Sequence, residues 1–253
     1  MYPAILQNLR VVMVETSHPG NMGSAARAMK TMGVKDLCLV APRRPFNQES
    51  WALASGSNDI LEQAQIVATL PEAIADRHVV IGASARAERT LQWPLMDARQ
   101  CGSFVAERLA EQKIALVFGR ERTGLTNEEL DHCHTLVHIP MAFDYLSLNI
   151  AASIQILAYE CAMAVRETPL PIVTEEELAT AEAMEGFYAH LEQSLIATRF
   201  LDPENPRLLM RRLRRLFGRA DVTNSEVNIL RGMLAAFQGR KFQQRSEDSW
   251  AGL

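Results

Sequence analysis

The sequence lacks the features that mark secreted, membrane-spanning and disulfide-stabilised proteins. Its four cysteines are scattered over 253 residues without a C-x-x-C pair, a pattern typical of reduced thiols in a cytoplasmic protein. The chain does not open on a basic segment followed by a long apolar one, so no signal peptide is predicted. No apolar run approaches the roughly 18 residues that a membrane helix needs. We therefore expect a cytoplasmic protein without a membrane anchor.

Glycine-rich phosphate-binding fingerprints are absent as well. The segment "SHPGNMGSAARAMKTMG" (17–33) follows the apolar run "LRVVMV" (9–14), an order that often places a phosphate at the start of a helix. Gly20 and Gly23 are three residues apart, however, and form neither G-x-G-x-x-G nor G-x-x-x-x-G-K-[ST]. This spacing argues against a dinucleotide site. It leaves a polar loop that carries Asn21 and, one helical turn into the next element, Arg27.

The overall charge gives no indication of a nucleic-acid partner, because the formal net charge is −4. The exception is local: between residues 199 and 245, eleven Arg and Lys residues stand against four Asp and Glu residues. On a helix over 207–217, one face would be apolar, formed by Leu208, Leu209, Leu213, Leu216 and Phe217. Arginines suit RNA phosphates, so we expect RNA contacts from Arg207, Arg211, Arg212, Arg214, Arg215 and Arg219. The alternative is that these arginines pair with an acidic helix at 175–192.

Short apolar runs alternate with helical segments up to about residue 167. The expected strands are 9–14, 36–40, 78–82, 114–119 and 135–139, and the expected helices between them are 23–32, 71–76, 103–111 and 126–132. This alternation predicts an α/β fold with a mostly parallel sheet and helices on both faces. The segment 147–165 then places apolar residues at 150, 154, 157, 158 and 161, which predicts one long helix packed on the sheet.

A break in this pattern at "RETPLPIVT" (166–174) predicts a boundary between two domains. We expect a linker at 168–174, with Thr174 as the N-cap of the following helix. Helices are expected at 175–199, 207–217 and 224–237. The predicted organisation is therefore a first domain at 1–167, a small all-α domain at 175–240 and a polar tail at 241–253.

Three polar clusters follow predicted strands, where open α/β sheets bind their ligands. They are the loop with Asn21, Gly23 and Arg27, the segment "FGRERTGLTNEEL" (118–130) and the segment "IPMAFDYLSLNIA" (139–151); "GASAR" (82–86) adds small residues after another strand. Taken singly, each cluster has a structural explanation. The glycines suit a turn, the charges suit a surface, and Thr126 with Glu129 forms a capping box at a helix start.

The stretch "HCHTLVH" (132–138) offers His132, Cys133, His134 and His138, but their spacing fits no familiar zinc motif. The stretch also crosses from a predicted helix into a predicted strand. We therefore predict no metal site there, and a nucleophilic pair of Cys133 with a histidine is not favoured either.

Taken together, the three clusters resemble the three sequence motifs of the SPOUT-class RNA 2′-O-ribose methyltransferases. The matching strings are "NMGSAAR" (21–27), "FGRERTGL" (118–125) and "IPM…SLNIA" (139–151), in the family's order and with its separations. The resemblance covers residues 6–167, and its wording is similar to the TrmJ branch, which methylates tRNA in the anticodon loop. It implies a SPOUT fold with a C-terminal trefoil knot, S-adenosylmethionine as the cofactor, tRNA as the substrate and a homodimer.

The resemblance also assigns roles to individual positions. Residues matching the family's catalytic or site-holding positions are Arg27, Asn21, Glu121, Ser147 and Asn149. Those matching cofactor positions are Ala83, Ser84, Ala85, Gly119, Ile139, Leu146, Ser147 and Leu148, and Arg120 and Tyr145 are candidate RNA contacts. Because a guanidinium is always protonated, we expect Arg27 to hold a phosphate and stabilise the developing alkoxide while water takes the proton. Glu121 is expected to orient its neighbours, and no metal is required.

The expected function is S-adenosylmethionine-dependent methylation of the ribose 2′-hydroxyl at nucleotide 32 of the tRNA anticodon stem-loop. Two alternatives remain open from the sequence: the same reaction on ribosomal RNA, and a catalytically silent RNA-binding protein on this scaffold. A nicotinamide-dependent oxidoreductase is disfavoured by the missing glycine fingerprint.

Overall fold

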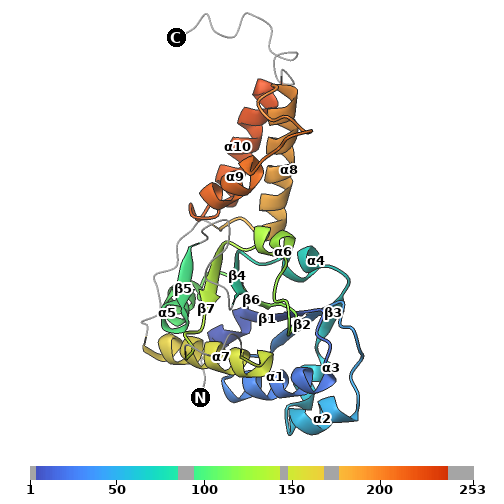
Figure 1. Cartoon of the computed structure of the whole chain (residues 1–253). Coiled ribbons are helices and arrows are strands. Elements are labelled where there is room, and N and C mark those ends of the chain that lie inside the picture. Colours follow the sequence, from blue (N-terminus) through green and yellow to red (C-terminus); the bar gives the residue numbers. More distant parts are fainter. Residues whose placement is uncertain (1–3, 85–93, 143–147, 168–176, 239–253) are drawn as a thin grey trace, which may run out of the picture. The chain divides into compact units, whose positions relative to one another are not determined.

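The apolar runs in the first part of the chain pair into one seven-stranded sheet (Figure 1). Its strands are β1 (Leu9–Val14), β2 (Asp36–Val40), β3 (Gln65–Val67), β4 (Val79–Ala83), β5 (Leu95–Asp97), β6 (Ile114–Phe118) and β7 (Thr135–His138). Their order is β3-β2-β1-β6-β4-β7-β5, and all six strand pairings are parallel. Parallel strands covered on both faces need continuous apolar residues, and β1 and β6 are buried along their whole length.

This computed structural model describes residues 4–84, 94–142, 148–167 and 177–238. The chain divides into two compact units, Met1–Glu175 and Glu176–Leu253. Each unit has its own hydrophobic core.

The five strands predicted from the sequence are confirmed, with boundaries that differ by at most one residue. Two further strands, β3 and β5, were not predicted. Both are three residues long and lie at the two edges of the sheet. A run this short has too few residues to show an alternating or continuous apolar pattern, so only pairing with a neighbour defines it.

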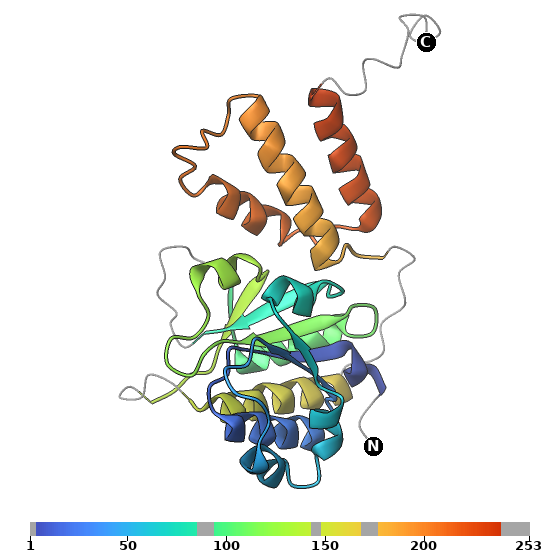
Figure 2. The same cartoon turned by 90° about the vertical axis from the view of Figure 1, so that its right-hand side faces the viewer.

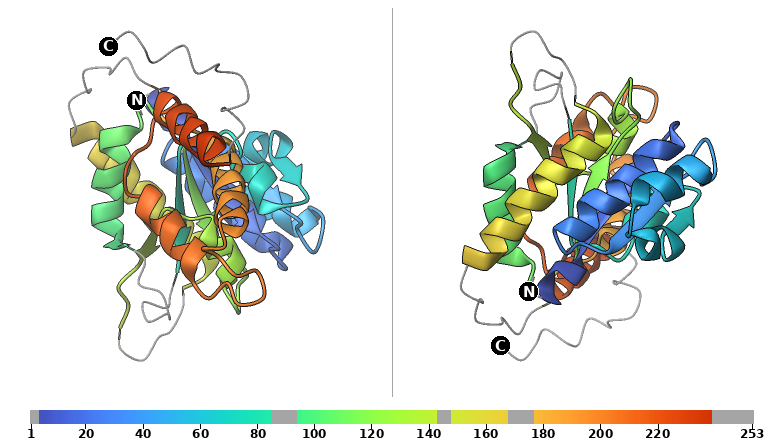
Figure 3. Two further views of the ribbon diagram at one scale, coloured as in Figure 1. Left: turned by 90° about the horizontal axis from the view of Figure 1, so that it is seen from above. Right: turned by 90° about the horizontal axis from the view of Figure 1, so that it is seen from below.

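Helices cover both faces of the sheet, as predicted. They are α1 (Pro19–Thr31), α2 (Gln48–Ala54), α3 (Asn58–Glu62), α4 (Leu70–Ile74), α5 (Ala98–Arg108), α6 (Asn127–Asp131) and α7 (Ile150–Glu167), after a 3₁₀ turn, η1, at Ala4–Asn8. The right-hand view of Figure 3 shows α1, α7 and α5 side by side on one face, and Figure 1 shows α4 and α6 on the opposite face. Neither α2 nor α3 was predicted.

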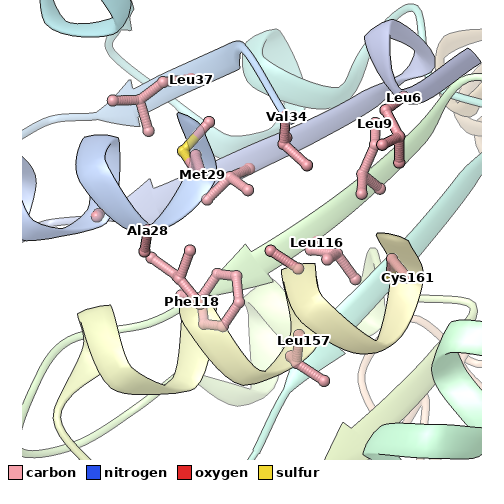
Figure 4. Packing of buried hydrophobic residues seen from close by; sticks show 14 of the residues in the cluster. Leu6, Leu9, Ala28, Met29, Val34, Leu37, Leu116, Phe118, Leu157 and Cys161 are labelled. Atoms are coloured by element: carbon pink, nitrogen blue, oxygen red, sulfur yellow. The ribbon is translucent and has the colours of Figure 1, made fainter. Parts of the chain in front are cut away.

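The core between the sheet and this helix layer forms where α7 packs on β1 and β6. Leu157 and Cys161 of α7 lie close to Leu116 and Phe118 of β6 in Figure 4, and both α7 side chains are fully buried. The five apolar positions predicted for this helix are all buried. Burying one leucine side chain contributes about 1.5–3 kcal/mol, so this seam fixes α7 firmly on the sheet.

The first helix begins earlier than predicted, at Pro19 instead of residue 23. Proline suits the first helical position, because its fixed φ matches the helix and the N–H it lacks would have no partner there. Asn21 and Gly23 therefore lie in the first turns of α1. The predicted polar loop at these positions is wrong.

The described residues of the second unit form three helices, α8 (Ala181–Ala197), α9 (Leu209–Phe217) and α10 (Asn224–Phe237), shown together in Figure 2. Their shared core contains Phe187, Tyr188 and Leu191 of α8 with Val227 and Leu234 of α10. The helices predicted at 207–217 and 224–237 are confirmed within two residues.

The helix predicted at 175–199 begins later, at Ala181. The hydroxyl of Thr180 caps it by accepting the backbone N–H of Ala183 at 3.2 Å. The preceding residues pair with the α9–α10 connection instead, since Ala179 donates its N–H to the Val222 carbonyl at 2.8 Å. The predicted cap, Thr174, lies outside the described residues.

No helix formed by the described residues is both long and apolar enough to cross a membrane. The described residues do not establish the expected trefoil knot, which stays a prediction.

Candidate active site

The candidate site lies at the carboxyl ends of β1, β4, β6 and β7. In the sheet, β1 and β6 are neighbours. The strand that follows β1 along the chain, β2, lies on the far side of β1 from β6, whereas the strand that follows β6, β7, lies on the far side of β6 from β1. The connections that follow the two strands therefore diverge. This divergence leaves a crevice at the strand ends, the usual place for a ligand in an open parallel sheet.

A chain of hydrogen bonds joins the three predicted motifs across this crevice. The Glu121 carboxylate accepts from the Asn21 amide at 3.0 Å, and the Asn21 carbonyl oxygen accepts from the Asn149 amide at 2.9 Å. Asn149 in turn caps α7, because its side-chain oxygen accepts the N–H of Ala151 at 2.9 Å. Three residues that are far apart in the sequence thus fix the starts of α1 and α7 relative to the β6–α6 loop.

Glu121 also holds the connection between β1 and α1. Its carboxylate accepts the backbone N–H of Ser17 at 3.1 Å and the Ser17 hydroxyl at 3.0 Å. Burial alone would raise the pKa of Glu121, but these hydrogen bonds, with those from its own backbone and Asn21, outweigh burial and lower it. Glu121 is therefore ionised at neutral pH, with its oxygens occupied by donors.

The loop between β6 and α6 is closed by Arg120. Two backbone hydrogen bonds join Arg120 and Gly124, and Gly124 adopts a φ of +68°, which glycine tolerates best. The Arg120 guanidinium binds Glu129 at 2.9 and 3.0 Å and also contacts Glu15, at the end of β1. Glu129 in addition completes the predicted capping box with Thr126, which is confirmed.

This ion-pair network raises the pKa of Arg120, through Glu129 first and then Glu15. Conversely, hydrogen bonds from Arg120 and then Arg43 lower the pKa of Glu15 to about 2. The contact of Arg120 with RNA stays a prediction. Its guanidinium already binds two carboxylates, which points to a role in shaping the loop.

A pocket of about 370 Å³ opens beside this loop; we call it the inner pocket. Five of the residues predicted to bind the cofactor line it together: Ala83, Ser84, Gly119, Ile139 and Leu148. The other three, Ala85, Leu146 and Ser147, lie outside the described residues, as does the candidate RNA contact Tyr145. The lining also includes Leu125, Val137 and Met141, which the sequence reasoning did not single out.

A second, more open hollow of about 470 Å³ adjoins the inner pocket; we call it the outer hollow. The two cavities share Glu121, Leu148 and Ile150. The outer hollow is lined by Asn21 and Asn149, and also by His18, Ser24, Glu49 and Leu53, which the sequence reasoning missed. Glu49 and Leu53 belong to α2, a helix too short for its periodicity to predict.

Arg27 is exposed on α1 and makes no hydrogen bond or ion pair that the structure records with another described residue. Gly20, Ser24 and Arg27 follow one another at helical spacing of four and three, so they share one face of α1. Gly20 and Ser24 line the outer hollow. Because long side chains on a helix lean toward its N-terminus, the Arg27 guanidinium can reach over Ser24 toward that hollow.

Residues of the cluster at 132–138 have a structural role, because they contact β4. The Cys133 thiol lies beneath β4, where a Cβ added to Gly82 would be 2.9 Å from its sulfur, and burial raises its pKa to about 12. Nδ1 of His134 accepts the N–H of Val80 at 3.0 Å. Across the part of the chain that the structure describes, no group of three His, Cys, Asp or Glu residues could hold a metal ion.

The basic helix α9 uses its arginines in two ways. Arg214 binds Glu185 of α8 and stacks 4.5 Å from the centre of the Tyr188 ring, so it joins α9 to α8 as the structural alternative expected. Arg207, Arg212 and Arg219 are exposed, whereas Arg211 and Arg215 are half-buried. The predicted apolar face is wrong in part: Met210, Leu213 and Phe217 pack on the core, while Leu216 is exposed.

The first compact unit, Met1–Glu175, matches a known methylase family. Residues 8–159 match the SpoU rRNA Methylase family, and residues 182–248 match the C-terminal domain of the tRNA methyltransferase TrmJ. The fold and the site thus define a SpoU-type methylase with an additional helical domain.

Curated relatives match this chain over almost their whole length. A tRNA (cytidine/uridine-2′-O-)-methyltransferase TrmJ from Klebsiella pneumoniae is 50% identical over 92% of this chain and 98% of its own. A tRNA (cytidine/uridine/adenosine-2′-O-)-methyltransferase TrmJ from Pseudomonas aeruginosa is 49% identical over 92% and 95%. The crystal structure of TrmJ from Z. mobilis ZM4 matches with a TM-score of 0.79 at 30% identity, over 90% of this chain and 98% of that one. The chain belongs to the TrmJ family of tRNA 2′-O-methyltransferases.

Proposed function

We propose that this protein transfers a methyl group from S-adenosylmethionine to the ribose 2′-hydroxyl of nucleotide 32 in the tRNA anticodon loop. The observation that carries the proposal is the Glu121–Asn21–Asn149 hydrogen-bond chain, which joins all three motifs beside two adjoining cavities.

The inner pocket fits the cofactor in size and chemistry. A volume of about 370 Å³ lies within the range of small-molecule sites. Its walls combine the small residues Ala83 and Gly119 with the apolar Leu125, Ile139 and Leu148, and main-chain groups can read the edge of an adenine. When bound, S-adenosylmethionine supplies an activated methyl group on a positively charged sulfur.

The residues of the outer hollow, together with Arg27 on the same face of α1 as Gly20 and Ser24, would then hold and activate the ribose. Arg27 carries a permanent positive charge, which stabilises a phosphate and the negative charge that develops on the 2′-oxygen as it loses its proton to water. Glu121 does not serve as the base, because its oxygens already accept hydrogen bonds and its pKa is lowered. Its part is to hold Ser17 and Asn21 in position.

The choice of tRNA would depend on the helical unit, whose exposed arginines on α9 and directly beside it, Arg207, Arg212 and Arg219, suit the phosphates of the anticodon stem-loop. We also propose that the enzyme acts as a homodimer through α7. Ala152, Ile156, Tyr159 and Met163 form an apolar stripe on its outer side, and Tyr159 is 47% exposed.

The test of this function is transfer of labelled methyl groups from S-adenosylmethionine to unmodified tRNA transcripts, followed by nuclease mapping of the product. We expect a 2′-O-methyl ribose at nucleotide 32. Tight binding of S-adenosylhomocysteine without transfer to tRNA would contradict the proposed substrate and direct the same assay to ribosomal RNA.

The proposed role of Arg27 has its own test. The substitution Arg27→Ala should reduce kcat at least a hundredfold while the affinity for S-adenosylhomocysteine stays unchanged, since Arg27 does not line the inner pocket. Lys35→Ala is the matched control, because it removes another exposed cation of the same unit. Equal activity in the two variants would exclude Arg27 from the reaction.

A further inference from the structure

The outer hollow contains a carboxylate that the proposed reaction does not use. Glu49 lies in the first turn of α2 and lines the hollow together with Asn21 and Asn149. Glu121, the other carboxylate of the hollow, is saturated by donors from Ser17 and Asn21. Glu49 is exposed, and the structure records no hydrogen bond that its carboxylate accepts from another described residue.

The position of Glu49 is fixed by the way in which α2 packs on α1. The Ser50 hydroxyl donates to the carbonyl oxygen of Pro19 at 2.9 Å, and Asn47 and Ser50 form a capping box at the start of α2. A Cβ added to Gly20 would be only 2.6 Å from Oε1 of Glu49. The carboxylate therefore lies directly over the first turn of α1, whose positive end favours an anion.

The remaining walls of the hollow suit a nucleobase. Leu53 and Leu148 are 42% and 38% exposed and line the hollow, so they offer apolar surface to a ligand. The faces of a base are apolar, while its edge carries donors and acceptors. A base between these leucines would present that edge to polar side chains of the hollow.

We propose that the outer hollow receives the base of the target nucleotide and that Glu49 is a specificity-determining residue that favours cytidine over uridine. An ionised carboxylate only accepts hydrogen bonds. Cytosine carries an exocyclic amino group that donates to it, whereas uracil has a carbonyl oxygen at the corresponding position and is repelled. This inference rests on the proposed function and specifies which nucleotides the site takes.

The test compares two tRNA transcripts that differ only in having cytidine or uridine at nucleotide 32. For the unmodified enzyme we expect kcat/KM to be about tenfold higher with cytidine, the discrimination expected of one side-chain contact to a base edge. Glu49→Gln should bring the ratio close to one, chiefly by raising kcat/KM for uridine, because an amide both donates and accepts. The affinity for S-adenosylhomocysteine should not change.

Glu62→Gln is the matched control, since Glu62 is an exposed glutamate at the end of α3 that lines neither cavity. A cytidine-to-uridine ratio near one in the unmodified enzyme, or a ratio that Glu49→Gln leaves unchanged, would overturn the assignment of Glu49 while the proposed reaction stands. Failure to methylate either transcript would overturn the proposed function, and the inference with it.

Discussion

The carboxylate of Glu121 receives hydrogen bonds from Ser17, His18 and Asn21, all in or next to the connection between β1 and α1. A general base needs a free lone pair and a pKa near the working pH. Glu121 has neither, since its pKa is lowered and its oxygens are engaged. The most conspicuous acidic residue of the site thus organises the backbone, which leaves the permanent charge of Arg27 as the electrostatic element that we propose.

Arg120 performs a similar organising function through ion pairs. We expect Arg120→Ala to lower the free energy of unfolding by about 2 kcal/mol and to weaken S-adenosylhomocysteine binding about tenfold, because the loop beside the inner pocket loses its contacts with Glu15 and Glu129. Urea unfolding and ligand titration measure the two effects. Arg43→Ala is the control, since Arg43 binds Glu15 without touching the loop.

The same network makes stability depend on pH. The pKa of Glu15 is lowered from an ordinary value of 4.5 to about 2. A carboxyl group with a lowered pKa stabilises the fold above its unfolded pKa, and that contribution is lost as the pH falls from about 4.5 to about 2. Between these limits, the unfolding free energy should fall more steeply in the unmodified protein than in Arg120→Ala. Parallel pH profiles would show that Arg120 does not stabilise ionised Glu15.

At the scale of elements, the approach of α2 to α1 positions one wall of the site. A Cβ added to Gly23 would be 2.0 Å from the Ser50 carbonyl oxygen, so only glycine permits this contact. The approach could not be predicted, because α2 has seven residues and its start depends on the Asn47 cap and on α1 itself. In contrast, α7 has eighteen residues with a clear apolar face, and its sequence pattern sufficed.

A pair of substitutions tests this packing. Gly23→Ala should destabilise the protein by about 1–3 kcal/mol, because the added methyl group forces α2 away from α1. Gly186→Ala on α8 should instead stabilise it by about 0.5–1 kcal/mol, since its nearest neighbour would be 3.8 Å away. Calorimetry of both variants checks the signs. A stabilising Gly23→Ala would mean that the two helices tolerate separation.

At the scale of the whole molecule, the chain divides into two units, and each unit has its own hydrophobic core. A net charge of −4 conceals a basic helix, and only the structure separates Arg214, which binds Glu185, from the exposed Arg207, Arg212 and Arg219. If the helical unit binds RNA as proposed, we expect the contacts to come from this exposed subset of its arginines.

Replacing Arg207, Arg212 and Arg219 by alanine in the full chain should weaken tRNA binding and flatten its dependence on salt. Each phosphate contact contributes about 0.7–0.9 to the slope of log K against log salt concentration, so the slope should fall by about 2. Arg99→Ala, which removes an exposed arginine of the first unit, provides the comparison. An unchanged slope would mean that the three arginines are merely solvated.

The sequence by itself determined the elements that are specified by a few consecutive residues. Continuous apolar runs specified the five central strands, Thr126 and Glu129 specified a helix start, and the order of three short strings specified the family. Each of these signals extends over a few consecutive residues, because burial and capping act on neighbouring positions.

Only the tertiary structure decided which of these residues meet. Asn21 is 100 positions from Glu121 and 128 from Asn149, and their hydrogen bonds exist because β1 lies beside β6 in the sheet. The same strand order brings Glu15 to Arg120 and leads α2 to the edge of the site with Glu49. Strand order depends on the free energy of the whole packed sheet, which no local pattern in the sequence expresses.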